Sequence, residues 1–186
     1  MRRLAAVLAT AAVTAGVLAG CGGDDGNWAK KCTTTDGVVE CAPDKRPAVE
    51  PITGELLDGT AYDMAQQKGK VVVVNFWGSW CAPCRAEADD LENTYQATKD
   101  RGVSFIGVNS RDDRDAAREF ERGRVTYPSL YDFPGQVGIQ FDVTNVSMPA
   151  TLIIDRQGRI AVALRQATTE AQLKPLVEKV AAEGQG

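Results

Sequence analysis

Residues 71–84 read VVVVNFWGSWCAPC, and this stretch decides the fold. The continuous β-branched and aromatic run Val71–Trp77 predicts a strand that is buried on both faces. Pro83 suits the first turn of a helix, which we expect to continue to about Lys99. The two cysteines of this stretch therefore stand where a strand gives way to a helix.

Cys81 and Cys84 have the placement of a reactive dithiol. The N-terminus of a helix offers unpaired N–H groups and about half a positive charge, both of which stabilise a thiolate. We therefore expect Cys81 to be exposed and to attack a disulfide, and Cys84, one turn further on, to resolve the mixed disulfide. The alternatives are a zinc site and a static disulfide. A zinc site would need further Cys or His ligands, and a static disulfide does not need a strand-to-helix junction.

The rest of the domain alternates between strand and helix patterns. Further strands are expected at 103–109, 150–155 and 160–164, and further helices at 111–122 and 169–182. The first two strands and the helix between them predict a right-handed parallel β-α-β unit, whereas the last two strands predict an antiparallel hairpin. The fold class is therefore α/β, with a mixed central sheet flanked by helices. Residues 54–63 have the pattern of a short separate hairpin.

Two of these helices carry more specific expectations. Ala116, Ala117 and Phe120 are expected to face inward from the helix at 111–122. Pro175 lies within the last helix, where a proline removes a backbone hydrogen bond. We therefore expect either a kink there or a later start of that helix.

The composition excludes several classes of function. The chain has 186 residues, a formal charge of −4 and no histidine. Without a basic excess, nucleic acid is not an expected partner. Without histidine there can be no Cys-His or Ser-His catalytic pair, no histidine metal ligand and no C-x-x-C-H haem attachment. We expect neither a metal nor another cofactor, so the chemistry depends on cysteine, carboxylate, lysine or backbone groups.

The N-terminus has the pattern of a lipoprotein signal. Two arginines at 2–3 precede an apolar stretch, residues 4–19, that is short for a membrane span but suits a signal peptide. It ends in residues 18–21, LAGC, which resemble the bacterial lipobox. An ordinary cleavage site that happens to precede a cysteine is the alternative. We expect residues 1–20 to be removed and Cys21 to carry a lipid that anchors the chain on the extracytoplasmic face of the cell membrane.

A second pair of cysteines precedes the expected domain. Cys32 and Cys41 bracket Asp36-Gly37, which is a strong signal for a two-residue hairpin turn. We expect a structural disulfide between them, which in the chain-entropy account stabilises so short a loop by roughly 2.5–3 kcal/mol. A second redox-active pair and a metal site are the alternatives. Residues 21–47 are otherwise expected to form a lipid-anchored tether, and the folded domain is expected at 48–186.

The stretch 75–84, NFWGSWCAPC, resembles the active site of the thioredoxin superfamily. Residues 69–71 (GKV) and 147–151 (SMPAT) extend the resemblance to the TlpA/ResA type of membrane-tethered, extracytoplasmic thiol–disulfide oxidoreductase. The resemblance covers residues 52–182 and implies a thioredoxin-like fold. Asn75 stands where many thioredoxins carry a buried aspartate, a departure that the TlpA/ResA type shares.

The same resemblance implies roles for further residues. Pro149 corresponds to the cis-proline that packs beside the dithiol, and Met148 would pair its backbone with an extended substrate. Glu87 corresponds to a glutamate that aids proton handling near the active site. If Glu87 is partly buried, its pKa should be raised and it could take a proton from Cys84; a solvated helix glutamate is the alternative. Trp80 would flank the substrate groove.

The sequence therefore predicts disulfide exchange with protein substrates. Ala82-Pro83, between the two cysteines, carries no charge that would strongly stabilise a thiolate, which favours a reductant. The resemblance implies reduction of apocytochrome c before haem attachment, with a membrane electron-transfer thiol protein as the redox donor. An oxidant or isomerase acting on exported proteins, and a non-catalytic binding lipoprotein, are the alternatives.

Overall fold

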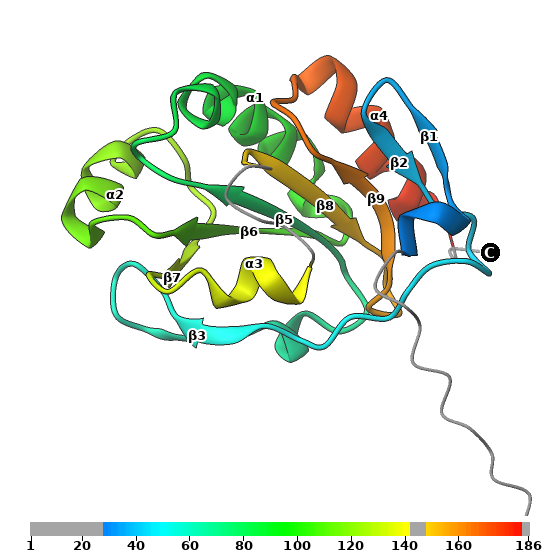
Figure 1. Ribbon diagram of the computed structural model, residues 1–186, viewed down its shortest axis with the longest axis horizontal. Coiled ribbons are helices and arrows are strands. Elements are labelled where there is room, and N and C mark those ends of the chain that lie inside the picture. Colours follow the sequence, from blue (N-terminus) through cyan, green and yellow to red (C-terminus); the bar gives the residue numbers. More distant parts are fainter. Residues whose placement is uncertain (1–27, 142–147, 184–186) are drawn as a thin grey trace, which may run out of the picture.

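A seven-stranded mixed sheet forms the centre of the computed structural model, which describes residues 28–141 and 148–183 (Figure 1). Its strands, in spatial order, are β1 (Thr33–Thr35), β2 (Val38–Glu40), β9 (Ile160–Leu164), β8 (Ala150–Ile154), β5 (Val71–Trp77), β6 (Val103–Ser110) and β7 (Ser129–Asp132). A separate hairpin contains β3 (Thr53–Glu55) and β4 (Ala61–Asp63). The helices are α1 (Ala82–Thr98), α2 (Arg114–Glu121), α3 (Gln136–Gln140) and α4 (Glu170–Ala182), with 3₁₀ turns η1 (Trp28–Lys31), η2 (Met64–Gln67) and η3 (Lys99–Arg101).

The strand β5 lies inside the sheet, between β6 and β8. It runs parallel to β6, with Val73 opposite Phe105, and antiparallel to β8, with Val73 opposite Ile153. All seven of its residues are buried, and alternate side chains enter two different cores. One core lies under α1 and α4, and the other lies on the face that carries β3 and α3 (Figure 1). The predicted mixed sheet with helices on its faces is therefore confirmed.

The second predicted helix begins later than its pattern suggested. The Asp113 side chain accepts hydrogen bonds from the backbone N–H groups of Asp115 and Ala116, and this cap fixes the start of α2 at Arg114. Ala117 is buried as predicted and Phe120 is half-buried. The prediction for Ala116 was wrong, because this residue is exposed and lines a surface groove.

Pro175 does not delay the last helix. The helix α4 begins at Glu170 and continues past the proline, so the predicted later start was wrong. Leu173 and Val177, on either side of Pro175, are both fully buried in the core shared with α1. This burial holds the two halves of the helix in place although one backbone hydrogen bond is missing.

The N-terminal hairpin belongs to the sheet, so the predicted start of the domain at Ala48 was wrong. The Asp36-Gly37 turn has positive φ at both residues, and β2 pairs with β9. Val39 is buried in the core, which ties the hairpin to the domain. The predicted tether is thus folded from residue 28 onward. The predicted signal peptide at 1–20, the predicted lipid site at Cys21 and the rest of the predicted tether lie outside the described residues. In the part of the chain that the structure describes, we found no helix long and apolar enough to cross a membrane.

We predict that the Cys32–Cys41 disulfide stabilises this hairpin and the sheet edge that it extends. The two Cα atoms are 4.5 Å apart, just outside the paired residues Thr33 and Glu40. The double variant Cys32→Ala/Cys41→Ala should lower the free energy of unfolding by about 2–3 kcal/mol, because the unfolded chain gains entropy. Urea denaturation of the oxidised proteins measures this, with the exposed Thr34→Ala as control. Equal unfolding midpoints for the double variant and the parent would contradict the prediction.

Candidate active site

The dithiol lies where β5 passes into α1. Cys81 is the N-cap of α1, with an extended backbone, and its sulfur accepts a hydrogen bond from the Cys84 N–H at 3.3 Å. The two cysteines form a disulfide, with their Cα atoms 5.3 Å apart. Both are buried, with 5% of Cys81 and 2% of Cys84 exposed. The expectation that Cys81 is exposed is therefore wrong for the disulfide form described here.

Two of the predicted substrate-facing residues lie next to this disulfide, Met148 in space and Trp80 in the sequence. The Met148–Pro149 peptide bond is cis, the isomer that the resemblance implies. It precedes β8, whose first residue, Ala150, is paired with Phe76 at the end of β5. The Met148 side chain packs against the cluster that contains both cysteines. Trp80 is 53% exposed, an unusual degree for a tryptophan, and so offers apolar surface beside the dithiol.

Glu87 lies one turn after Cys84 and is buried, with only 2% of its surface exposed. Its carboxylate accepts hydrogen bonds from the Asn75 side chain and from the Thr168 N–H, each at 2.9 Å. Burial raises the pKa of Glu87 to about 7, although these two hydrogen bonds act in the opposite direction. A carboxyl with a pKa near neutrality can both take and give a proton under ordinary conditions. The structure thus places Glu87 in a buried polar network rather than in solvent.

Asp112 is a site residue that the sequence analysis missed. Its buried carboxylate accepts hydrogen bonds from the Ser79 N–H at 2.5 Å, from the Ser79 hydroxyl at 2.8 Å and from the Asn109 amide at 2.8 Å. These contacts hold the loop that leads into Cys81. Parallel strands end at the same edge of a sheet, so an aspartate just after β6 was a signal that could have identified it.

A half-buried acid, Glu121, lies behind the active-site loop. Trp77 donates its indole N–H to the Ser129 hydroxyl at 3.1 Å, and that hydroxyl donates in turn to Glu121. Burial raises the pKa of Glu121 to about 7, and the hydrogen bond from Ser129 opposes this shift. This chain of contacts connects the last residue of β5 to α2 and β7.

Comparison with known proteins identifies the family. The Redoxin family profile matches residues 42–176. The chain belongs to the Redoxin family. It is 31% identical over 117 residues to the thiol-disulfide oxidoreductase ResA of Bacillus subtilis (strain 168). These aligned residues make up 62% of this chain and 64% of that protein.

Two solved structures resemble the described domain closely. A DsbF homologue from Corynebacterium diphtheriae has a TM-score of 0.73 and 33% identity, covering 77% of this chain and 92% of that one. A secreted thiol-disulfide isomerase from Corynebacterium glutamicum has a TM-score of 0.72 and 31% identity, covering 78% and 96%. The thioredoxin-like fold and the TlpA/ResA type are confirmed, and the chain has the fold and dithiol of a thiol–disulfide oxidoreductase.

We predict that Glu87 makes stability depend on pH. Its pKa rises from 4.5 to about 7 on folding, so its contribution to stability is complete below pH 4.5 and is lost as the pH rises to about 7. In Glu87→Gln the side chain stays neutral. The free energy of unfolding of the variant, relative to that of the parent, should therefore rise by about 3 kcal/mol between about pH 4 and about pH 8.

Urea denaturation of the oxidised proteins across this pH range measures the shift. Keeping both disulfides closed removes thiol titration from the comparison. Asp89→Asn, on the exposed face of the same helix, is the matched control for a charge change without burial. Parallel pH profiles for the Glu87 variant and the parent would show that the folded state does not shift this carboxyl.

Proposed function

We propose that this protein exchanges disulfides with exported proteins through Cys81 and Cys84. The single observation that carries the proposal is the disulfide between these residues at the N-terminus of α1. A thiolate at that position is stabilised by the helix N-terminus. Met148, whose side chain packs against the cluster that contains both cysteines, is the residue whose backbone would pair with the extended chain of a substrate.

In the reducing direction, the reaction begins with the dithiol form. The Cys81 thiolate attacks one sulfur of the substrate disulfide, and the other substrate sulfur leaves and takes up a proton. Cys84 then loses its proton and attacks the Cys81 sulfur of the mixed disulfide, which releases the second substrate thiol. Two electrons pass to the substrate, and Cys81 and Cys84 become a disulfide. Glu87, one turn along α1, is the group that we assign to accept the Cys84 proton.

We propose that the protein works in this reducing direction, in cytochrome c maturation, as the TlpA/ResA resemblance implies. The apocytochrome c disulfide would be the substrate, and a membrane electron-transfer thiol protein would restore the dithiol. Two acids lie close to the cysteines: Asp112 accepts hydrogen bonds from Ser79, which is two residues before Cys81, and Glu87 lies one turn after Cys84. Negative charge near a cysteine disfavours its thiolate, and a less stable thiolate makes a weaker oxidant.

A second candidate is an oxidant or isomerase that acts on exported proteins. The name of the Corynebacterium glutamicum neighbour, a secreted thiol-disulfide isomerase, favours this candidate. That structure also matches more of this chain than the ResA relative does. The two candidates share the dithiol and differ in the direction of electron flow.

The proposed location is the outer face of the cell membrane, with Cys21 as the lipid-bearing residue. The LAGC sequence at 18–21 supports this location, as does the secreted neighbour from Corynebacterium glutamicum. The Cys32–Cys41 disulfide is also consistent with an oxidising compartment. A lipid at Cys21 would keep the domain at the membrane, close to a membrane-bound thiol donor.

We predict that Cys84→Ala accumulates mixed disulfides in the cell, because no second thiol can release the substrate from Cys81. Non-reducing gels after acid quenching and alkylation would reveal the adducts, and mass spectrometry would identify them. Apocytochromes among the adducts support the reductant, whereas exported proteins with structural disulfides support the second candidate. Cys81→Ser should trap nothing. Equal adducts in both variants would argue against Cys81 as the attacking residue.

We also predict that Cys21→Ala releases the protein from the membrane. Two or three acyl chains hold a domain durably, since each buried CH₂ group contributes roughly 0.8 kcal/mol. Partition into Triton X-114 detergent should fall from most of the protein to almost none. The matched control, Cys32→Ala, changes a cysteine outside the lipobox. Detergent partition that persists in Cys21→Ala would show that another feature anchors the chain.

A further inference from the structure

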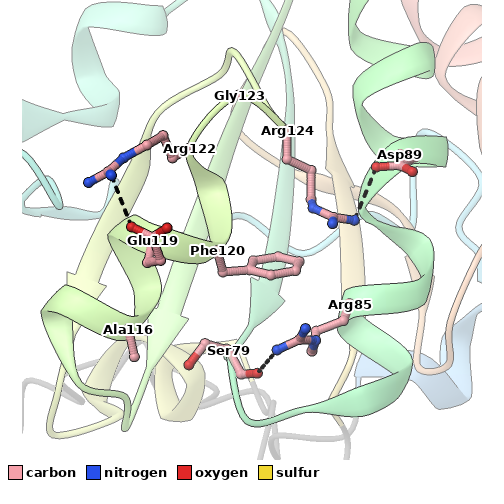
Figure 2. Close-up of a pocket in the computed structure, with 9 residues that line it drawn as sticks. All are labelled: Ser79, Arg85, Asp89, Ala116, Glu119, Phe120, Arg122, Gly123 and Arg124. Carbon is pink, nitrogen blue, oxygen red and sulfur yellow. Dashed lines mark hydrogen bonds and ion pairs between the residues drawn. The ribbon is translucent and has the colours of Figure 1, made fainter.

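A surface groove of about 650 Å³ lies beside the active-site loop (Figure 2). The loop and α1 form one wall, with Ser79, Arg85 and Asp89. The end of α2 and the turn after it form the other wall, with Phe120 and residues 122–124. The Phe120 ring lies between the two walls, and the guanidinium groups of Arg85 and Arg124 approach it from different sides (Figure 2).

The charges in this groove are unbalanced. Arg122 is paired with Glu119 at 3.0 Å, and Arg124 is paired with Asp89 at 3.3 Å. Those two pairs engage both acids that line the groove. Among the described residues, Arg85 has no carboxylate partner, and its side chain is exposed. A guanidinium has five N–H donors, and the contact with Ser79 uses only one of them.

Arg85 is held in place before any ligand arrives. One of its N–H groups donates to the Ser79 carbonyl oxygen at 3.3 Å, and its guanidinium carbon lies 5.2 Å from the centre of the Phe120 ring. A side chain that is already ordered loses less conformational entropy when it binds. The planar fork of arginine suits a carboxylate, which it can bind through two parallel hydrogen bonds.

Two residues of the groove, Arg85 and Phe120, contact the dithiol segment. Arg85 follows Cys84 in the sequence, and its N–H donates to the Cys81 carbonyl oxygen at 3.1 Å. Phe120 packs against the cluster that contains both cysteines. A peptide joined to the Cys81 sulfur therefore reaches Arg85 within a few residues, since an extended chain advances by about 3.3 Å per residue.

We propose that this groove binds an acidic segment of the protein substrate, and that Arg85 pairs with an aspartate or glutamate next to the substrate's reactive cysteine. Phe120 supplies the apolar floor for the rest of that segment. The inference rests on the proposed disulfide exchange and adds a preference for substrates with acidic flanks. Arg85 is thus a specificity-determining residue, whereas the cysteines perform the chemistry.

The test compares short peptides that differ only beside one cysteine. Each peptide carries that cysteine as a mixed disulfide with 2-mercaptoethanol, flanked on both sides by Asp or by Asn. The reduced enzyme supplies two electrons, so each turnover gives the peptide thiol, free 2-mercaptoethanol and the Cys81–Cys84 disulfide. Stopped-flow tryptophan fluorescence follows the oxidation. Each rate is divided by that of dithiothreitol with the same peptide, which removes the peptide's intrinsic reactivity.

At low salt, the wild-type protein should favour the acidic peptide about fivefold, as expected for one ordered surface ion pair. In Arg85→Gln the two peptides should react at about equal normalised rates. In the wild-type protein the preference for the acidic peptide should decline as salt is added. Because the readout is a ratio, a change in thiolate reactivity caused by losing the arginine cancels. Arg101→Gln removes an exposed arginine beyond the far end of α1 and should keep the full preference.

Equal rates for the two peptides in the wild type, or a preference that survives Arg85→Gln, would overturn the inference while leaving disulfide exchange intact. Equal rates together with binding to phosphatidylglycerol vesicles that Arg85→Gln abolishes would assign the groove to a lipid surface instead. If both peptides react with the wild-type protein no faster than with Cys81→Ser, the proposed disulfide exchange is wrong, and the inference that rests on it is wrong as well.

Discussion

Burial of β5 on both faces is the constraint on which the site depends. All seven residues from Val71 to Trp77 are buried, and the strand is paired on both sides along its length. Such a strand cannot slip by one residue, because that would move every side chain into the wrong core. The end of β5 is therefore fixed, and so is the start of α1. Cys81 becomes the N-cap of that helix through the packing of residues that take no part in the chemistry.

Two acids attach to this fixed frame in different ways. Asp112, just after the neighbouring strand β6, holds the loop before Cys81 through two hydrogen bonds from Ser79. Glu87 lies on the buried face of α1, where Asn75 of β5 and Thr168 before α4 donate to its carboxylate. A buried acid that is only partly satisfied by hydrogen bonds has a raised pKa. The same packing that positions the dithiol therefore also raises the pKa of Glu87, the acid that we propose as the acceptor of the Cys84 proton.

The sequence predicted the elements whose signals are local and long. The run at 71–77 and the dithiol after it needed only hydrophobic continuity and one proline. The elements within residues 125–141 were not predicted. The strand β7 has four residues and the helix α3 has five, which is too few to show a hydrophobic periodicity. The hairpin at 33–40 was predicted with its turn, but its pairing with β9 is a contact between distant residues that no local pattern encodes.

The same distinction separates the site residues. Glu87 is buried because its face of α1 packs against α4 and the sheet. The sequence alone does not specify this packing, so both a buried and a solvated Glu87 remained compatible with it. Asp112 required knowledge that β6 ends beside β5. The structure then separates the charges around the dithiol: the carboxylates of Glu87 and Asp112 are buried, and the guanidinium of Arg85 is exposed. Because dissolved salt screens the exposed charge more than the buried ones, the substrate attraction that we propose for Arg85 should depend on salt more strongly than the proton transfer that we propose for Glu87.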